Sequence, residues 1–472
     1  MGRPDDTAWL DATAQAELVR RGEATPAELV DAAIARIDAY DAELNAVIHK
    51  LYDKARAAAE ADLPHGPFRG VPFLVKDAVA HTAGDPYHCG MRLLKEREWT
   101  EPADSYLVER FRAAGFVIVG KTNTPELASD FTTEPEAYGA SRNPWDRTRS
   151  TGGSSGGSGA AVASGMVPVA HGNDMGGSIR VPSAHCGLVG LKPSRARTSL
   201  GPGFGEYWGM LTHEHVLTRS VRDTAAVLDC TAGARPGDPY TAPPPARPWR
   251  DEVGVDPGRL RVGFRTAIPG RGVDAHPDTV AAVTETAALL ASLDHEVDPS
   301  SPAALDDDFS QAVLPYFASA ISRDVDRWSQ RLGVEIGEGD IEGRNWFFHS
   351  VGQTVTAPQL FAITEWIQGW SRRLASWWAD GYDLLLTPTF EFPPPLLGQP
   401  LDPDAAPGRF TMPWDFTGQP AISLPLHWNA DGLPIGVQLV APAWREDLLI
   451  RVASQLEAAR PWADRHPTVP AI

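Results

Sequence analysis

Two glycine- and serine-rich segments contain the residue types that nucleophilic catalysis and anion binding require. Residues 150–165 read STGGSSGGSGAAVASG, and residues 172–182 read GNDMGGSIRVP. A serine hydroxyl acts as a nucleophile once a base removes its proton. Paired glycines before a serine let the backbone approach a ligand closely, and successive N–H groups in such a turn form an anion-binding nest. The second segment therefore predicts a place for an oxyanion.

The first segment, taken alone, is open to three other interpretations. A flexible linker has this composition, but the apolar run at 166–170 follows almost directly and indicates a buried strand. A phosphate-binding loop ends in Gly-Lys-Ser/Thr, which is absent here. Residues 152–156 satisfy the Gly-x-Ser-x-Gly pattern of a nucleophile elbow, but that motif needs an apolar strand before it, and residues 143–151 are polar.

The elements that must position these segments alternate between short apolar runs and amphipathic stretches. The run at 71–75 predicts a buried strand that ends at Lys76, and a rhythm of strand, helix and strand recurs later in the chain. The expected strands are 71–75, 116–119, 166–170, 260–264 and 382–386, and the expected helices are 103–114 and 276–292. This alternation predicts an α/β fold with a large central mixed, mostly parallel sheet flanked by helices.

One domain spanning residues 1–472 is expected, with two special segments. Residues 1–62 are predicted to be helical, with two helices within 25–62, because Thr25, Pro26 and Glu28 supply a cap, a first-turn proline and a capping-box acid. Residues 231–258 are rich in proline and charge and are predicted to form a surface crossover loop.

Composition argues against several classes of partner. The chain has 42 basic and 61 acidic side chains and a formal charge of −19, which would repel nucleic acid and anionic membranes. No stretch approaches the roughly 18 apolar residues of a membrane span, and the amino terminus lacks the order of a secretory signal, which favours a cytoplasmic protein. Cys89, Cys186 and Cys230 show no CxxC spacing, so reduced thiols are expected.

The sequence around both serine-rich segments resembles the signature of the amidase signature family. The matching motifs are GGSSGGSGAAVASG and GNDMGGSIRVPSAHCGLVGLKPS. The resemblance extends over most of the chain, because it also includes RGVPFLVKD, LTRSVRD, YDLLLTPT, TGQPAISLP and GLPIGVQLVAP. The resemblance implies the amidase signature fold and a triad of Ser178 as nucleophile, Ser154 as proton shuttle and Lys76 as base. It also implies a cis peptide bond before Ser154.

The roles implied by the resemblance are chemically consistent. A lysine amine accepts a proton only when it is neutral, so Lys76 needs a pKa below its ordinary value of about 10.4, which burial in a closed site provides. Neutral Lys76 would deprotonate Ser154, which in turn would deprotonate Ser178 as that hydroxyl attacks the carbonyl. The same relay would protonate the leaving nitrogen, because an amide nitrogen leaves poorly until it is protonated.

The resemblance further implies an oxyanion hole formed by the backbone N–H groups of Met175, Gly176, Gly177 and Ser178, with neither metal nor cofactor. Each such donor contributes about 3 kcal/mol in the transition state. Many relatives have threonine where this chain has Met175, which leaves these backbone contacts unaffected. Many also have asparagine where this chain has Asp415, a departure whose effect the sequence does not predict.

Other charged residues near the site are interpreted as structural. Asp174 and Arg180 flank the second serine-rich segment and are expected to support it. His213 and His215 stand on either side of Glu214, but no third ligand is signalled nearby, so no metal is assigned.

The predicted function is hydrolysis of the C–N bond of a small-molecule amide through an acyl-enzyme on Ser178. Fifteen tryptophans favour bulky or apolar substrates. A carbamate or ester hydrolase with the same triad is one alternative, and an amidotransferase subunit that needs partner proteins is another. The stretch 214–223 looks closer to stand-alone amidases, including the aminohexanoate cyclic-dimer hydrolases. A homodimer is expected from the family.

Overall fold

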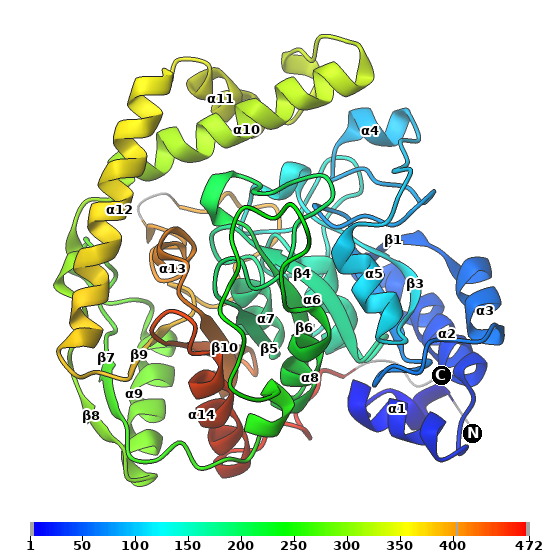
Figure 1. Ribbon diagram of the computed structural model, residues 1–472, viewed down its shortest axis with the longest axis horizontal. Coiled ribbons are helices and arrows are strands. Elements are labelled where there is room, and N and C mark those ends of the chain that lie inside the picture. The colour runs from blue at the N-terminus through cyan, green and yellow to red at the C-terminus, as the bar shows by residue number, and fades with distance from the viewer. Residues whose placement is uncertain (1–3, 403–404, 469–472) are drawn as a thin grey trace.

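A computed structural model describes residues 4–402 and 405–468, and within them a mixed sheet of eleven strands runs through the molecule (Figure 1). The strand order is β1-β3-β2-β4-β6-β5-β10-β11-β9-β7-β8. The strands are β1 (Val47–Lys50), β2 (Pro72–Lys76), β3 (Val117–Thr122), β4 (Val169–Asp174), β5 (Val189–Lys192), β6 (His213–Thr218), β7 (Arg261–Phe264), β8 (Glu296–Asp298), β9 (Leu384–Pro388), β10 (Ala421–Trp428) and β11 (Pro434–Val440).

The sheet is mixed, as the sequence predicts, but it is not mostly parallel. Of the ten strand pairings among the described residues, six are antiparallel. The antiparallel pairings from β4 through β6, β5, β10 and β11 to β9 make up the middle of the sheet. Continuous apolar runs are typical of any strand buried on both faces, so they do not distinguish a parallel strand from a central antiparallel one.

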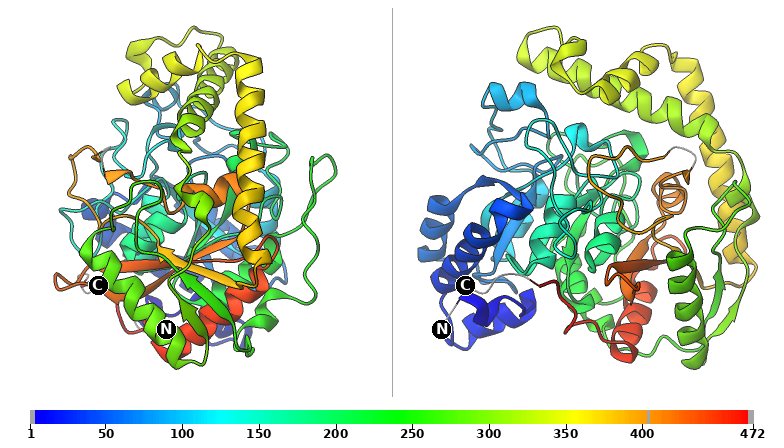
Figure 2. Two further views of the ribbon diagram at one scale, coloured as in Figure 1. Left: turned by 90° about the vertical axis from the view of Figure 1, so that its left-hand side faces the viewer. Right: turned by 180° about the vertical axis from the view of Figure 1, so that it is seen from behind.

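Helices flank the sheet (Figure 1). Three of them, α10, α11 and α12, lie outside the sheet layers, where α10 packs against the other two (Figures 1 and 2). The helices are α1 (Ala12–Arg20), α2 (Pro26–Leu44), α3 (Tyr52–Glu60), α4 (Arg92–Glu96), α5 (Tyr106–Ala113), α6 (Gly156–Ala163), α7 (Arg180–Cys186), α8 (Val221–Thr231), α9 (Pro277–Ser292), α10 (Ser310–Leu332), α11 (Gly343–Gly352), α12 (Ala357–Ala379), α13 (Met412–Thr417) and α14 (Glu446–Ala459).

In the described residues 4–62, the helices α1, α2 and α3 are accompanied by one strand, β1, that was not predicted from sequence. The capping box before α2 is formed, since Oγ1 of Thr25 accepts the N–H of Glu28 at 3.2 Å and the Glu28 carboxylate accepts the N–H of Thr25 at 2.7 Å. Between α2 and α3, the four residues of β1 pair antiparallel with β3. A run this short between two helices carries no clear alternation of its own, so only its pairing with β3 reveals it.

The strands that position the serine-rich segments are parallel neighbours. Leu74 of β2 pairs with Ala170 of β4, so both strands run toward the same edge of the sheet and end there at Lys76 and Asp174. β4 begins three residues later than the predicted strand at 166–170, because Pro168 cannot donate a ladder hydrogen bond. The turn with Ser178 and the end of β2 therefore meet at one edge.

Large apolar clusters surround this arrangement. One lies between the carboxy-terminal half of the sheet and α8, α9 and α14, and a second includes residues of α10 and α12 around Trp328 and Trp370. Residues 232–260 connect α8 to β7 and contain one short 3₁₀ helix, η4 (Trp249–Glu252). In the described part of the chain, no helix is long and apolar enough to cross a membrane.

Candidate active site

Lys76, the last residue of β2, is fully buried. Its Nζ lies 2.6 Å from Oγ of Ser154 and 2.6 Å from Oδ1 of Asn173. Loss of water around an amine penalises its charged form, so burial lowers the pKa of Lys76 to about 7, against an opposing contribution from the Glu214 carboxylate. A large fraction of this amine is therefore neutral near pH 7 and able to accept a proton.

Ser154 lies in the loop that leads into α6, and the glycines before it are needed there. The peptide bond between Gly153 and Ser154 is cis, as the family resemblance implied. A Cβ at Gly153 would lie 2.4 Å from the carbonyl oxygen of Thr132, so any other residue would collide with the backbone. Gly152 has a φ of +75°, in the left-handed region that favours glycine. The glycines therefore allow the close packing that brings the Ser154 hydroxyl to Lys76.

Ser178 lies in the turn between β4 and α7 and is 5% exposed. Its carbonyl oxygen accepts the N–H of Ser155 at 3.3 Å, which joins the two serine-rich segments. The residue lines a cavity of about 200 Å³, which we call the catalytic pocket. The structure thus gathers Lys76, Ser154 and Ser178 from three distant segments at one edge of the sheet.

The turn before Ser178 is held by buried polar side chains. Oδ1 of Asp174 accepts the N–H of Gly177 at 2.6 Å, and Oδ2 accepts the N–H of Ile179 at 3.1 Å. Oγ1 of Thr411 donates to the carbonyl oxygen of Gly176 at 2.5 Å. These contacts fix the path of the backbone, so its remaining N–H groups have defined directions.

The four predicted oxyanion donors differ in their surroundings. The N–H of Gly177 is already bonded to Asp174. Among the described residues, the N–H groups of Met175, Gly176 and Ser178 make no hydrogen bond to the protein. All but Gly177 also line the catalytic pocket. Three backbone donors thus remain for a substrate oxygen.

Arg180 lies between the carboxyl groups of Asp174 and Asp415. Its Nη2 lies 2.8 Å from Oδ1 of Asp174 and 2.7 Å from Oδ2 of Asp415. Burial raises the pKa of Asp415 well above its ordinary value, and the charge of Asp174 adds to this. Burial also acts to raise the pKa of Asp174, but the charge of Arg180 outweighs it and the pKa is lowered. These contacts confirm Asp174 and Arg180 as supports and place Asp415 beside them.

The catalytic pocket is mostly apolar. Its lining includes the side chains of Phe131, Met175, Trp208, Phe317 and Met412. Two charged residues also reach it, and they form an ion pair with one another: Asp130 and Arg344. An apolar group attached to a carbonyl at Ser178 would therefore be buried against aromatic and thioether side chains.

The residues that surround Lys76 were not predicted from sequence. Asn173 accepts from Nζ, and its Nδ2 donates to the carbonyl oxygen of Ala78 at 2.9 Å, which fixes the orientation of the amide. Nδ1 of His171 accepts the backbone N–H of Lys76 at 3.2 Å, and Nε2 of the same ring binds Glu214. His171 and Asn173 are two residues apart on β4, and strand alternation was a signal that they share one face.

His213, Glu214 and His215 lie together on β6, but their side chains have separate partners. Glu214 binds His171, and Nδ1 of His213 lies 2.7 Å from the carbonyl oxygen of Leu211. Nε2 of His215 lies 3.2 Å from the carbonyl oxygen of Thr224. In the described ranges, no group of three or more His, Cys, Asp or Glu side chains is arranged to hold a metal ion.

This fold and this site define an amidase. The amidase family model matches residues 28–450, and the chain belongs to that family. It is an enzyme that hydrolyses amide C–N bonds.

Particular relatives are similar along nearly the whole chain. A 6-aminohexanoate-cyclic-dimer hydrolase of Pseudomonas sp. (strain NK87) is 44% identical, with 97% of this chain and 96% of that protein covered. The solved structure of a 6-aminohexanoate cyclic dimer hydrolase superposes with a TM-score of 0.93 at 44% identity, covering 98% of this chain and 99% of that one. A bacterial aryl acylamidase of the amidase signature family has a TM-score of 0.88 at 26% identity, covering 96% and 97%.

Proposed function

We propose that this amidase hydrolyses bulky, apolar amides through an acyl-enzyme on Ser178, with Ser154 as proton shuttle and Lys76 as base. The observation that carries the proposal is the 2.6 Å contact between Nζ of a fully buried Lys76 and Oγ of Ser154. A neutral amine at this distance takes the proton of Ser154 as Ser154 takes that of Ser178.

The transfer between the two serines depends on a bound substrate. Among the described residues, Oγ of Ser154 is hydrogen-bonded to Nζ of Lys76 and not to the hydroxyl of Ser178, although the N–H of Ser155 bonds the Ser178 carbonyl oxygen. Catalytic hydrogen bonds often tighten only when substrate is bound. Attack by Oγ of Ser178 forms a bond to the carbonyl carbon, and the proton passes through Ser154 to Lys76. The same path then returns it to the leaving nitrogen, and water hydrolyses the acyl-enzyme.

The negative oxygen that forms during attack needs donors. We assign this role to the N–H groups of Met175, Gly176 and Ser178, each of which can contribute about 3 kcal/mol in the transition state. Gly177, which the family resemblance also places in the oxyanion hole, acts in this proposal by holding the turn to Asp174, whose Oδ1 its N–H contacts at 2.6 Å.

The substrate class is supported by the pocket and by the relatives. The catalytic pocket is lined mainly by apolar side chains, and similar proteins are named 6-aminohexanoate-cyclic-dimer hydrolase. We therefore propose amides with an aliphatic or aryl acyl group. Carbamates and esters are accessible to the same acyl chemistry. Purified chain, as the homodimer that the family leads us to expect, acts in this proposal without a partner protein.

The test compares matched substrates with the wild type and with Ser178→Ala. The panel contains an apolar acyl anilide, the corresponding carbamate and ester, the 6-aminohexanoate cyclic dimer and a small polar amide. We expect the wild type to cleave the apolar amides and the variant to lose that activity. Equal activity of wild type and variant would place the nucleophile elsewhere. Refusal of aryl and long-chain amides beside turnover of small polar ones would overturn the substrate class.

A further inference from the structure

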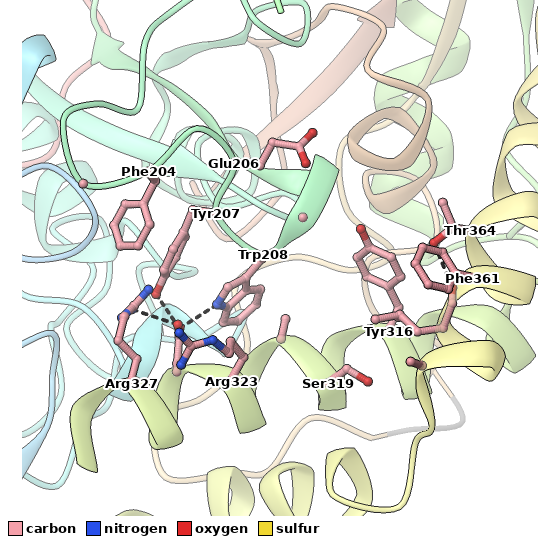
Figure 3. A pocket seen from close by; sticks show the side chains of 16 residues that line it. Phe204, Glu206, Tyr207, Trp208, Tyr316, Ser319, Arg323, Arg327, Phe361 and Thr364 are labelled. Carbon is pink, nitrogen blue, oxygen red and sulfur yellow. Dashed lines mark hydrogen bonds and ion pairs between the residues drawn. The ribbon is translucent and has the colours of Figure 1, made fainter. Parts of the chain in front are cut away.

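A second, larger cavity lies next to the catalytic pocket, and the two share one side chain. The second cavity has a volume of about 640 Å³ and is formed by residues 203, 204 and 206–209 together with α10 and the start of α12 (Figure 3). We call it the outer chamber. Trp208 lines both cavities, whereas Ser178 lines only the smaller one. The indole therefore stands between the nucleophile and a large additional space.

Helix α10 continues this partition. Val313, Phe317 and Ile321, which are four residues apart and so share one face of the helix, line the catalytic pocket. Tyr316 and Ala320 on the adjacent face line the outer chamber. The ring of Phe317 meets the indole of Trp208 edge to face, with centroids 5.5 Å apart. The wall between the cavities thus consists of one helix and one aromatic side chain that packs against it.

The indole is anchored by a buried carboxylate. Nε1 of Trp208 donates to Oδ2 of Asp324 at 2.8 Å, and the hydroxyl of Tyr207 donates to the same oxygen. Arg327 pairs with the other oxygen of Asp324 at 2.8 Å, and Figure 3 shows Tyr207, Trp208 and Arg327 converging there. A hydrogen bond to a buried carboxylate is stronger than one between neutral groups, so the orientation of the indole is well defined.

The backbone that carries Trp208 is also constrained. Trp208 has a φ of +51° and Gly209 a φ of +57°, both in the left-handed region, which non-glycine residues occupy at a cost. A Cβ at Gly209 would lie 2.1 Å from the hydroxyl oxygen of Tyr316, and that oxygen accepts the N–H of Met210 at 3.2 Å. The loop is therefore held directly against α10, and the indole has little freedom to move away from the partition.

The group that this partition limits is the acyl part of the substrate. Once Ser178 has attacked, the acyl group stays bonded to its Oγ, so it must occupy the cavity that Ser178 lines. We propose that Trp208 is the specificity-determining residue that ends the catalytic pocket and limits the length of the acyl group. This inference rests on the proposed function, because it takes Ser178 to be the nucleophile. Acyl groups that fill the pocket react well, and longer ones meet the indole.

The outer chamber is suited to bind the part of a long acyl chain that the indole of Trp208 excludes. Its lining includes the aromatic rings of Phe204, Tyr207, Tyr316 and Phe361. Removal of the indole joins this space to the catalytic pocket, so that a long apolar acyl chain can extend past α10. A change of one methylene in an apolar pocket is worth about 1–3 kcal/mol, so several excluded methylenes amount to a large difference in rate.

The test uses alkyl fluorophosphonates, which place an alkyl chain on the nucleophilic serine as an acyl group does. The labelling rate of wild type, Trp208→Ala, Trp208→Phe and Trp428→Ala is measured by intact-mass spectrometry over a series of chain lengths. Ser178→Ala identifies the labelled residue. Trp428 is the matched control because it lines neither cavity. Thermal unfolding of each variant identifies any loss of the fold.

We expect the wild-type rate to rise and then fall as the chain lengthens. In Trp208→Ala the labelling rate should begin to fall only at longer alkyl chains. For the longest chain, the variant should be labelled at least about tenfold faster than the wild type. Trp208→Phe is intermediate, and Trp428→Ala follows the wild type. Superimposable profiles for wild type and Trp208→Ala, or a wild type without a length limit, would overturn the inference. Labelling that persists in Ser178→Ala would instead overturn the nucleophile assignment and, with it, the premise of this inference.

Discussion

Nζ of Lys76 lies 2.6 Å from Oδ1 of Asn173, the same distance that separates it from Oγ of Ser154. Among the residues that the structure describes, the amine therefore has two neutral oxygen neighbours and no carboxylate in direct contact. A neutral amide orients the amine without stabilising its charged form as a carboxylate would. In the proposed mechanism, this arrangement keeps Lys76 available as a base near neutral pH and keeps its amine directed toward Ser154.

The wild-type enzyme should gain activity with rising pH through about 7. Burial lowers the pKa of Lys76 to about 7, and only the neutral amine can act as base. Below that pH the neutral fraction falls about tenfold per pH unit, so kcat/KM should fall with it, and above it the rate should level off. A pH profile with a stable anilide measures this. A flat profile between pH 5 and about 8 would contradict the role of Lys76.

Asn173→Asp should shift the rise of kcat/KM with pH to higher pH. The new carboxylate would lie against Nζ of Lys76 and favour the charged amine, so the pKa of Lys76 would increase and less base would be available at pH 7. Asn173→Ala is the matched control, because it removes the same contact without adding a charge. It should lower kcat but not shift the profile upward. A profile of Asn173→Asp that coincides with the wild type would show that this contact does not control the base.

Glu214→Gln should shift the rise of kcat/KM with pH to lower pH. The charge of Glu214 opposes the effect of burial on Lys76, and Glu214 is linked to Lys76 through the ring of His171. Loss of that charge should lower the pKa of Lys76 further, so activity persists to lower pH. Glu285→Gln, at an exposed position far along the chain, controls for the change in net charge. An upward shift in Glu214→Gln would contradict the electrostatic argument.

Ser154→Ala should impair amide hydrolysis more than ester hydrolysis. Both reactions need activation of Ser178, but an amide nitrogen must also receive a proton before it leaves, whereas an activated phenol ester does not. A general acid–base group contributes about 10²- to 10⁴-fold, so the loss for the anilide should lie in that range and the loss for the matched ester should be smaller. The comparison of kcat/KM for both substrates measures it. Equal losses would remove proton delivery from the role of Ser154.

The three catalytic candidates were assigned through the family resemblance, which could be recognised because each of them belongs to a local motif. Lys76 ends an apolar run, and Ser154 and Ser178 belong to glycine-rich segments whose motifs span adjacent residues. The surroundings of Lys76 depend on strand pairing. Asn173 of β4 lies opposite Glu214 of β6, two segments that hydrophobic patterns alone do not bring together. The same limit applies to Trp208, whose role depends on the docking of α10 against its loop.

Asp174→Asn should destabilise the fold and slow catalysis, whereas Asp415→Asn should do little. The pKa of Asp174 is lowered, and its carboxylate accepts hydrogen bonds from the turn before Ser178 and from buried Arg180. Replacement by asparagine leaves the charge of Arg180 without this carboxylate. It can also direct the side-chain amide N–H toward backbone N–H groups of the turn. Breaking such a buried pair costs about 3–5 kcal/mol. Burial raises the pKa of Asp415, which favours its protonated form, and asparagine resembles a protonated aspartate. Urea unfolding and kcat of both variants test this, and equal destabilisation by the two substitutions would show that Asp415 carries the charge that balances Arg180.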